Sequence, residues 1–355
     1  MSALDFLYHA NPSRVLFGSG SLQHLEREVQ ALGATRALVL CSPAQRNLGE
    51  SIAFQLGSMA IGVFSGASMH VPIEIVTEAH AVARSLHADC AIAIGGGSAI
   101  GLGKAIALRS NLPVIAVPTT YSGSEMTPIY GITEAGSKKT GTNHKALPRT
   151  VIYDPELTLS LSVAMSVTSG INALAHAAEG LYATDANPVT SLLAEEAISA
   201  LAKGIPDVCI DARDIEARRL MLYGAWLAAT VLGSVGMALH HKLCHTLGGS
   251  FGLPHAETHT IILPHALAYN ARAAPEAMSR IANALGAVDA SLGTFNLAHA
   301  SGAQLALRDI GMLEPSLDRA AKLASSNPYP NPRPIEQDAI RALLQDAFEG
   351  CVPRP

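Results

Sequence analysis

The segment that decides the fold is residues 90–120, which read CAIAIGGGSAIGLGKAIALRSNLPVIAVPTT. Residues 90–94 are a short apolar run, the pattern of a buried parallel strand, and residues 99–108 have a helical pattern. The glycines between them would let backbone amides approach a phosphate, and the N-terminus of the following helix would add a favourable dipole. GGGS by itself is equally typical of a plain turn between a strand and a helix, so this motif alone leaves both interpretations open.

Short apolar runs alternate with helical stretches up to residue 155. The runs lie at residues 36–41, 58–64, 90–94, 113–118 and 150–153. This alternation predicts a parallel sheet with helices on both faces. Beyond Asp154 and Pro155, segments rich in Ala, Leu and Glu dominate, with helical patterns at residues 188–202, 215–232, 275–285, 295–309 and 335–348. Loops are expected at residues 140–149 and 325–333.

The sequence therefore predicts two domains. Residues 1–155 are expected to form an α/β dinucleotide-binding domain with a mainly parallel sheet, and residues 156–355 an all-helical domain. The glycine motif belongs to the first domain, and the histidines described below belong to the second. This division predicts an active site in the cleft between the two domains.

Whole-chain composition favours a cytoplasmic enzyme. Among the 355 residues, 49% are hydrophobic and only 15% are charged, which is typical of a compact protein with an extensive interior. The net charge of −5 and the absence of a basic tract argue against a nucleic-acid partner. The sequence contains no run of about 20 apolar residues that would suggest a membrane span. Its N-terminal residues lack the apolar core of a signal peptide. Five scattered cysteines suit reduced thiols, and Cys244 is expected to pack rather than react.

Histidines concentrate in the second half of the chain. Six of the 14 lie within residues 240–265. His241 and His245 are four apart and would share one face of a helix. His255 follows Pro254 after a Gly-rich turn, where a second helix could start and aim its first residue back at that face. Converging imidazoles suit a metal site, an acid/base site or a receptor for an anion, whereas the alternative is a set of capping and surface histidines.

A second helical segment upstream fits the same pocket. Residues 168–180 read TSGINALAHAAEG, and Asn172 and His176 are again four apart on one face. Together with the histidine segment, this pattern resembles the iron-dependent (group III) alcohol dehydrogenases. The resemblance implies their fold, which is the dehydroquinate synthase-like fold with an α/β N-terminal domain and an all-α C-terminal domain.

The same resemblance assigns site residues. In that family an Asp and a His on the first helix, with two His from the later segment, hold a divalent metal. The matching positions here are Asn172, His176, His241 and His255, and His245 matches a further active-site histidine beside the substrate. A neutral amide is a poor substitute for a carboxylate toward a divalent cation, so no obligatory metal is expected. The alternative is a tolerated swap, in which His176, His241 and His255 still bind a metal.

The departure at Asn172 comes with the doubled His240–His241 and the string LPHAETH at residues 253–259. This combination resembles the maleylacetate reductase branch of the family, whose members use NADH or NADPH without an obligatory metal. The branch implies reduction of the C=C bond of maleylacetate to 3-oxoadipate in the catabolism of aromatic compounds, by a homodimer. His245 is the first candidate for the proton donor and His241 the second. A metal-dependent alcohol or glycerol dehydrogenase and a non-catalytic nucleotide-binding protein remain as alternatives.

Cofactor residues also follow from the resemblance. The order of the glycine motif, the Lys104 stretch and the Thr-rich end of the next apolar run is similar to the diphosphate loop of the family. Ser42 stands where NAD-selective relatives carry Asp, so use of both NADH and NADPH is expected. Gly101 replaces a usual Asp, and residues 119–125 are one residue shorter than in many relatives. The implied cofactor contacts are Ser42, Gly96, Gly97, Ser98, Thr119, Thr120 and Ser122, with Thr127, Lys139 and Leu157 as weaker ones.

Overall fold

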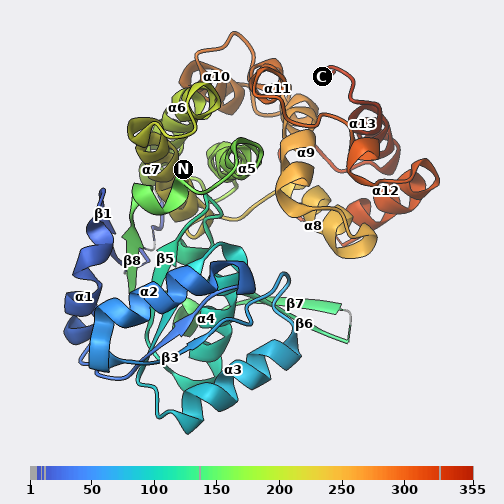
Figure 1. Ribbon diagram of the computed structural model, residues 1–355. Coiled ribbons are helices and arrows are strands. Elements are labelled where there is room, and N and C mark those ends of the chain that lie inside the picture. The colour runs from blue at the N-terminus through green and yellow to red at the C-terminus, as the bar shows by residue number, and fades with distance from the viewer. Residues whose placement is uncertain (1–5, 9, 12, 136, 328, 355) are drawn as a thin grey trace. The chain divides into compact units, whose positions relative to one another are not determined.

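The computed structural model describes residues 6–8, 10–11, 13–135, 137–327 and 329–354. The chain divides into two compact units, an N-terminal unit of Ala10–Leu161 and a C-terminal unit made mainly of Ser162–Pro355 (Figure 1). The division falls after Leu161, whereas the sequence places it after residue 155. Each unit has a hydrophobic core of its own.

The N-terminal unit is built on a six-stranded parallel sheet in the order β1-β8-β5-β4-β2-β3. The strands are β1 (Arg14–Phe17), β2 (Ala37–Leu40), β3 (Ala60–Phe64), β4 (Cys90–Gly95), β5 (Val114–Pro118) and β8 (Thr150–Tyr153). The central strands β2, β4, β5 and β8 are buried at every residue, which explains their continuous apolar runs. The five predicted strands are confirmed, and the sequence missed only β1 in this sheet.

Helices cover both faces of this sheet. They are α1 (Leu25–Ala31), α2 (Arg46–Leu56), α3 (Ile73–Ser85) and α4 (Gly97–Ser110). Side chains of α1 and α2 pack with Val39 and Ile92 on one face. On the opposite face, α4 lies so close to β4 that a Cβ on Gly103 would meet the Cβ of Ala93 at 2.9 Å. A glycine is therefore required at residue 103 for this close packing.

The prediction of a loop at residues 140–149 is wrong in part. Strand β7 (Ser137–Thr142) pairs antiparallel with β6 (Ile129–Glu134), so residues 140–142 belong to a hairpin and not to a loop. The run of Lys and Thr carries too few apolar residues to mark a strand in the sequence. Its pairing with β6 stabilises it instead.

All the regular secondary structure in the described residues of the C-terminal unit is helical. Its helices are α5 (Val163–Leu181), α6 (Pro188–Ile210), α7 (Ile215–Leu232), α8 (Leu239–Phe251), α9 (His255–Asn270), α10 (Pro275–Leu285), α11 (Ala290–Ala300), α12 (Leu317–Ser325) and α13 (Gln337–Glu349). Its hydrophobic core joins α8, α9, α12 and α13. The predicted helices over residues 215–232 and 275–285 are confirmed at both ends. In the described part of the chain, no helix combines the length and the apolar character needed to cross a membrane.

The helix predicted over residues 295–309 is wrong in its position. Helix α11 begins earlier, at Ala290, because Asp289 caps it by accepting the backbone N–H of Leu292. It ends at Ala300, where Gly302 adopts a φ of +73°, and Leu307–Ile310 form only a short 3₁₀ helix. The sequence also missed α12, whose apolar positions are mostly alanines.

Candidate active site

The glycine motif forms the turn between β4 and α4. Gly95 has a φ of +139°, and a Cβ there would collide with the side chain of Gln45, so only glycine fits. A Cβ on Gly97 would meet nothing nearer than Ser122 Oγ at 3.9 Å. The N-cap residue of α4 is Gly96, which has no side chain to cap the helix. The first amides of α4 therefore remain available to an anionic group.

Polar side chains that follow β2 and β5, the two strands next to β4, gather at this turn. Gln45 Nε2 donates to Thr119 Oγ1 at 2.7 Å, and Ser42 Oγ donates to Gln45 Oε1 at 3.5 Å. The Thr120 side chain faces Gly96, and its buried hydroxyl has no hydrogen-bond partner within the described residues. The structure thus brings Ser42, Thr119 and Thr120 to the glycine turn. Gln45 was missed by the sequence analysis, although it lies one helical turn after Ser42.

The three weaker cofactor candidates make other contacts. Thr127 is buried and accepts a hydrogen bond from Lys104 Nζ at 3.0 Å. Lys139 is 70% exposed in its side chain and pairs with Glu134 at 2.5 Å. Leu157 packs against the hydrophobic core of the sheet. These contacts give each residue a structural role in the N-terminal unit.

A buried lysine lies on α4, the helix that follows the glycine turn. Lys104 is fully buried, and its ammonium donates to Thr127 Oγ1, Ser124 Oγ and the carbonyl of Ile129. Burial lowers the pKa of Lys104 to about 7. Because these acceptors all lie in residues 124–129, Lys104 fixes the segment that follows the Thr-rich strand end.

The histidine site belongs to the C-terminal unit and is built by helices α5, α8 and α9. On α5, Asn172, His176 and Glu179 occupy positions i, i+4 and i+7, so they share one face. All three are buried, at 3%, 4% and 0% exposure. Glu179 was not singled out in the sequence, although its spacing from Asn172 and His176 marks it as a member of the same face.

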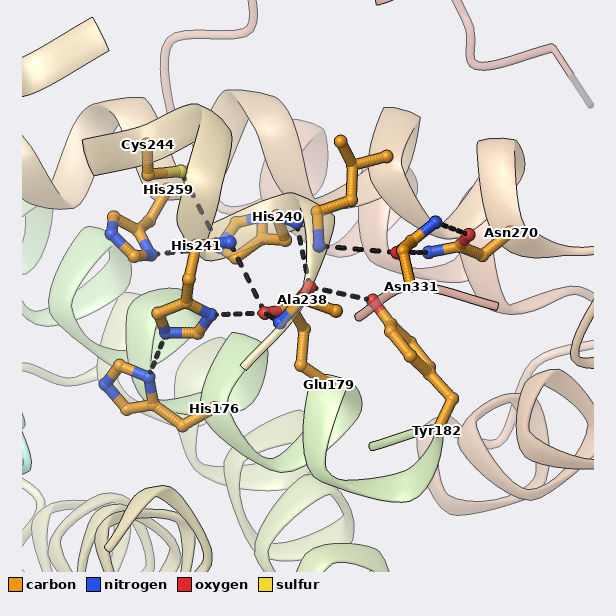
Figure 2. Close-up of polar contacts among 11 residues, drawn as sticks. His176, Glu179, Tyr182, Ala238, His240, His241, Cys244, His259, Asn270 and Asn331 are labelled. Carbon is orange, nitrogen blue, oxygen red and sulfur yellow. Dashed lines mark hydrogen bonds and ion pairs between the residues drawn. The ribbon is translucent and has the colours of Figure 1, made fainter. Parts of the chain in front are cut away.

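The carboxylate of Glu179 lies at the beginning of α8 (Figure 2). It accepts the backbone N–H groups of Ala238 at 2.9 Å, His240 at 2.8 Å and His241 at 3.3 Å. The hydroxyl of Tyr182 donates to it at 3.3 Å. Burial would raise the pKa of Glu179, but the hydrogen bond from the His241 ring and the nearby amides lower it to about 2. Glu179 is therefore an anion that caps α8 from another helix.

His241 connects Glu179 to His176. Its Nδ1 lies 2.6 Å from Glu179 Oε2, and its Nε2 lies 2.7 Å from His176 Nδ1 (Figure 2). Both ring nitrogens of His241 are thus engaged. The expected convergence of His176 and His241 is confirmed in geometry, but the two rings meet each other through a hydrogen bond.

A second histidine pair lies next to the first, with its rings 5.1 Å and 5.2 Å from that of His241 between centroids. His240 Nε2 is 2.9 Å from His259 Nδ1, and Cys244 Sγ is 3.8 Å from His240 Nε2. All three residues are buried, and burial lowers the pKa of His240 to about 3 and that of His259 well below its usual range. These rings stay neutral near pH 7. Cys244 packs in the hydrophobic core, as expected from the sequence.

His245 and His255 differ from the four buried rings because they are exposed. The His245 ring lies 6.1 Å from that of His241, and the His255 ring lies 4.3 Å from that of His259, both measured between centroids. Helix α9 begins at His255, as the sequence predicted from Pro254. They therefore form the part of the cluster that a substrate can reach from solvent.

A divalent metal does not fit the positions that the family would use for it. Asn172 offers a neutral amide oxygen, which is buried and has no hydrogen-bond partner in the described part of the chain. Nδ1 of His176 and Nε2 of His241 lie 2.7 Å apart and are hydrogen-bonded to each other. Glu179 could supply negative charge, but its carboxylate already accepts hydrogen bonds from the start of α8 and contacts the ring of His241. This donor set lacks the carboxylate that would compensate the charge of a hard or borderline divalent cation such as iron.

Comparison with known proteins identifies the family. Residues 12–155 match the family model "Iron-containing alcohol dehydrogenase", and residues 166–348 match "Fe-containing alcohol dehydrogenase family, C-terminal". The chain is 58% identical over 348 residues to a maleylacetate reductase of Burkholderia cepacia, across 98% of this chain and 99% of that relative. These matches confirm the resemblance inferred from the sequence.

Solved structures agree. The chain is similar to the crystal structure of maleylacetate reductase from Agrobacterium tumefaciens, with a TM-score of 0.96 and 52% identity over 98% of this chain and 99% of that one. It is also similar to iron-containing alcohol dehydrogenase from Corynebacterium glutamicum, with a TM-score of 0.93 and 42% identity over 97% of each chain. The predicted fold class is confirmed. The chain therefore belongs to the iron-containing alcohol dehydrogenase family, a family of NAD(P)H-dependent oxidoreductases.

Proposed function

We propose that this enzyme reduces the C=C bond of maleylacetate with NADH or NADPH and forms 3-oxoadipate. The observation that carries the proposal is the make-up of the histidine site, which offers two exposed imidazoles and a neutral amide where a metal site would need a carboxylate. The relatives at 58% and 52% identity, both maleylacetate reductases, support the same substrate.

The charge of the substrate suits this site. Maleylacetate is a dianion, and protonated rings at His245 and His255 would attract its carboxylates. Asn172, in place of an acidic residue, avoids repelling them. We therefore assign His245 and His255 to substrate binding. His176 and His241 are buried and form a hydrogen-bonded pair.

The reaction requires a hydride and a proton. The nicotinamide C–H bond breaks and its electron pair, as hydride, forms a C–H bond at the alkene carbon β to the ketone. The π electrons move onto the carbonyl oxygen as an enolate, and the cofactor becomes oxidised. A proton then adds to the α carbon and restores the ketone. Hydrogen-bond donors that face the enolate oxygen would stabilise it without a metal.

The cofactor would bind to the glycine turn of the N-terminal unit. The amides of Gly97 and Ser98 at the start of α4 suit the diphosphate. Ser42 carries no charge, so it can bond a ribose hydroxyl without repelling a 2′-phosphate. This is the basis for proposing use of both NADH and NADPH.

We further propose that turnover does not depend on a tightly bound metal, because the donor set at Asn172, His176, His241 and His255 contains no anionic ligand. The proposed setting is a homodimer in the cytoplasm, in the catabolism of aromatic compounds. The five cysteines are free thiols, which supports a reducing compartment.

The deciding experiment is an NADH-oxidation assay of the purified enzyme. It compares maleylacetate with simple aldehydes and ketones, each with and without a chelator. We expect turnover of maleylacetate that survives chelation. Asn172→Asp should raise zinc or iron affinity and slow maleylacetate turnover in chelated buffer, whereas the neutral control Asn172→Ala should gain no metal affinity. Stoichiometric metal in the wild type, with activity lost on its removal and regained on its return, would overturn the proposal.

A second candidate function is a metal-dependent alcohol dehydrogenase. The observation that favours it is the similarity to the iron-containing alcohol dehydrogenase of Corynebacterium glutamicum at 42% identity over 97% of the chain. That function predicts reduction of an aldehyde or ketone, and the same assay separates the two. Metal-dependent carbonyl reduction with no maleylacetate turnover would establish the alternative.

A further inference from the structure

A cavity of about 360 Å³ lies within the C-terminal unit, and its described lining residues include none of the histidine site. Helix α9 lines it with His265 and Tyr269, which are four apart and so share one face. Helix α13 contributes the apolar side chains of Ala342 and Leu343. Both helices belong to one hydrophobic core, which holds the walls in place. The volume is in the range of sites for small molecules.

His265 gives this cavity a polar atom that lacks a partner. The side chain is only 3% exposed, and its Nε2 makes no hydrogen bond within the described residues. Buried polar atoms in folded proteins are nearly always paired with protein, water or a ligand. Burial lowers the pKa of His265 to about 4, so the ring is neutral near pH 7 and has one N–H to donate. An oxygen acceptor in the cavity would pair this nitrogen.

Two arginines line the cavity, and they differ in their partners. Arg354 pairs with the carboxylate of Asp346, so these two charges compensate each other. Arg333 pairs with no carboxylate in the part of the chain that the structure describes. Its guanidinium stacks on the ring of Tyr269, with Cζ 4.1 Å from the centroid, and Nη1 donates to the Tyr269 carbonyl at 3.4 Å. One positive charge is therefore uncompensated, and its planar fork suits a carboxylate.

The backbone at Arg333 is fixed by two asparagines. Asn331 Nδ2 donates to the carbonyl of Arg333 at 2.6 Å. The side chains of Asn331 and Asn270 are hydrogen-bonded to each other at 3.1 Å and 2.7 Å (Figure 2). A guanidinium held in this way loses little freedom when it binds a ligand.

We propose that the cavity lined by α9 and α13 binds a small monocarboxylate with an apolar body, either aromatic or aliphatic. The carboxylate pairs with the guanidinium of Arg333 and with Nε2 of His265, and the apolar body contacts Ala342 and Leu343. A single uncompensated charge and an apolar wall favour a monoanion over the dianion proposed as the substrate. This is a second site, and it does not depend on the proposed function.

The test is isothermal titration of the purified full-length enzyme with benzoate, which combines one carboxylate with an apolar ring. Benzamide has the same ring without the charge, and acetate has the charge with almost no apolar body. We expect one benzoate per chain, with benzamide and acetate each bound at least about tenfold more weakly. No benzoate binding up to about 10 mM would overturn the proposal. Inorganic phosphate bound as tightly as benzoate would also overturn it, because the site would then select charge alone.

Variants locate the bound probe. Arg333→Met keeps much of the apolar stem and should raise the Kd for benzoate by about tenfold or more. The matched control is Arg341→Met, which removes a guanidinium that pairs with Asp318 and does not line the cavity, and it should bind as the wild type does. Equal weakening in both variants would overturn the proposal. His245→Ala should keep its affinity for benzoate. Loss of binding in His245→Ala, with binding retained in Arg333→Met, would place benzoate at the histidine site instead.

A further variant covers the case in which Arg333→Met fails to fold. Ala342 is exposed on α13, so Ala342→Phe can place a ring over the cavity without removing a polar group. It should abolish benzoate binding, and unchanged affinity would contradict the assignment. Because every readout is binding of a probe, failure of the enzyme to turn over maleylacetate would leave these outcomes unaffected.

Discussion

The glycine turn of the N-terminal unit and the histidine site of the C-terminal unit are built in different ways. The turn offers backbone amides and open space, since a Cβ on Gly97 would meet nothing nearer than Ser122 Oγ at 3.9 Å. The histidine site consists of side chains that contact one another, from Glu179 through His241 to His176. The first region depends on shape, and the second depends on where protons and charges lie. Substitutions in the two regions should therefore affect different measured quantities.

The largest expected effect is loss of catalysis on truncation of an exposed histidine. His245→Ala should lower kcat/KM for maleylacetate by about 10²-fold or more, because it removes an exposed imidazole that we propose to bind the dianion. NADH affinity should stay unchanged, since the glycine turn belongs to the other unit. Steady-state kinetics and NADH fluorescence titration measure the two quantities. The control is His299→Ala, which removes an exposed histidine on α11. A His245→Ala enzyme as active as the control would contradict the assignment.

A larger side chain at the glycine turn should instead weaken the binding of NADH. Gly97→Val would place a branched side chain where the diphosphate approaches the amides of α4, so the Kd for NADH should rise by about 30-fold, or roughly 2 kcal/mol. The protein should fold normally, because the space beside Gly97 accommodates a Cβ. Isothermal titration with NADH measures the change. Unchanged affinity would show that the diphosphate binds elsewhere.

Sequence patterns predicted the parts of the fold that periodicity determines. Buried parallel strands and long amphipathic helices follow from local apolar spacing, and the start of α9 at His255 follows from Pro254. The hairpin of β6 and β7 was missed because its stability comes from pairing between strands with few apolar residues. The cap of α11 by Asp289 was available in the sequence and was overlooked.

The candidate site was predicted in its residues but not in its contacts. Spacing on α5 and α8 indicated that Asn172, His176 and His241 share a pocket. It could not show that His176 bonds to His241, because that depends on how α5 packs against α8. Burial also separates the exposed rings of His245 and His255 from the neutral pair of His240 and His259. That distinction belongs to tertiary structure and has no sequence signal.

A smaller effect is expected at the adenosine end of the cofactor site. The wild type should use NADH and NADPH within about an order of magnitude in kcat/KM, or ~1.4 kcal/mol. Ser42→Asp should shift the preference toward NADH by about tenfold, because a carboxylate repels a 2′-phosphate. Ser42→Asn, which has a similar shape and no charge, is the control. Strong rejection of NADPH by the wild type would show that another residue sets the selectivity.

The smallest effect concerns stability and comes from the buried histidine pair. His240 has a folded-state pKa of about 3 because of burial, against about 6.5 when unfolded, so below pH 6.5 the unfolded chain binds a proton that the folded chain does not. As the pH is lowered below 6.5, this group should therefore reduce the free energy of unfolding by up to about 1.4 kcal/mol per pH unit. Glu179, with a folded-state pKa of about 2, starts to contribute only below about pH 4.5. Between pH 6.5 and 4.5, the change of stability with pH therefore comes from the buried histidines and not from Glu179.

Denaturant unfolding in this window can be followed through Trp226, the single tryptophan, which lies on α7 in the C-terminal unit. His240→Asn removes the titrating ring and should make the dependence of unfolding free energy on pH shallower by about one proton. His299→Asn, at an exposed position, should leave the dependence as in the wild type. Equal slopes in both variants would mean that His240 is protonated in the folded protein. The cluster would then hold positive charge inside the fold, and the description of His240 and His259 as a buried neutral pair would be wrong.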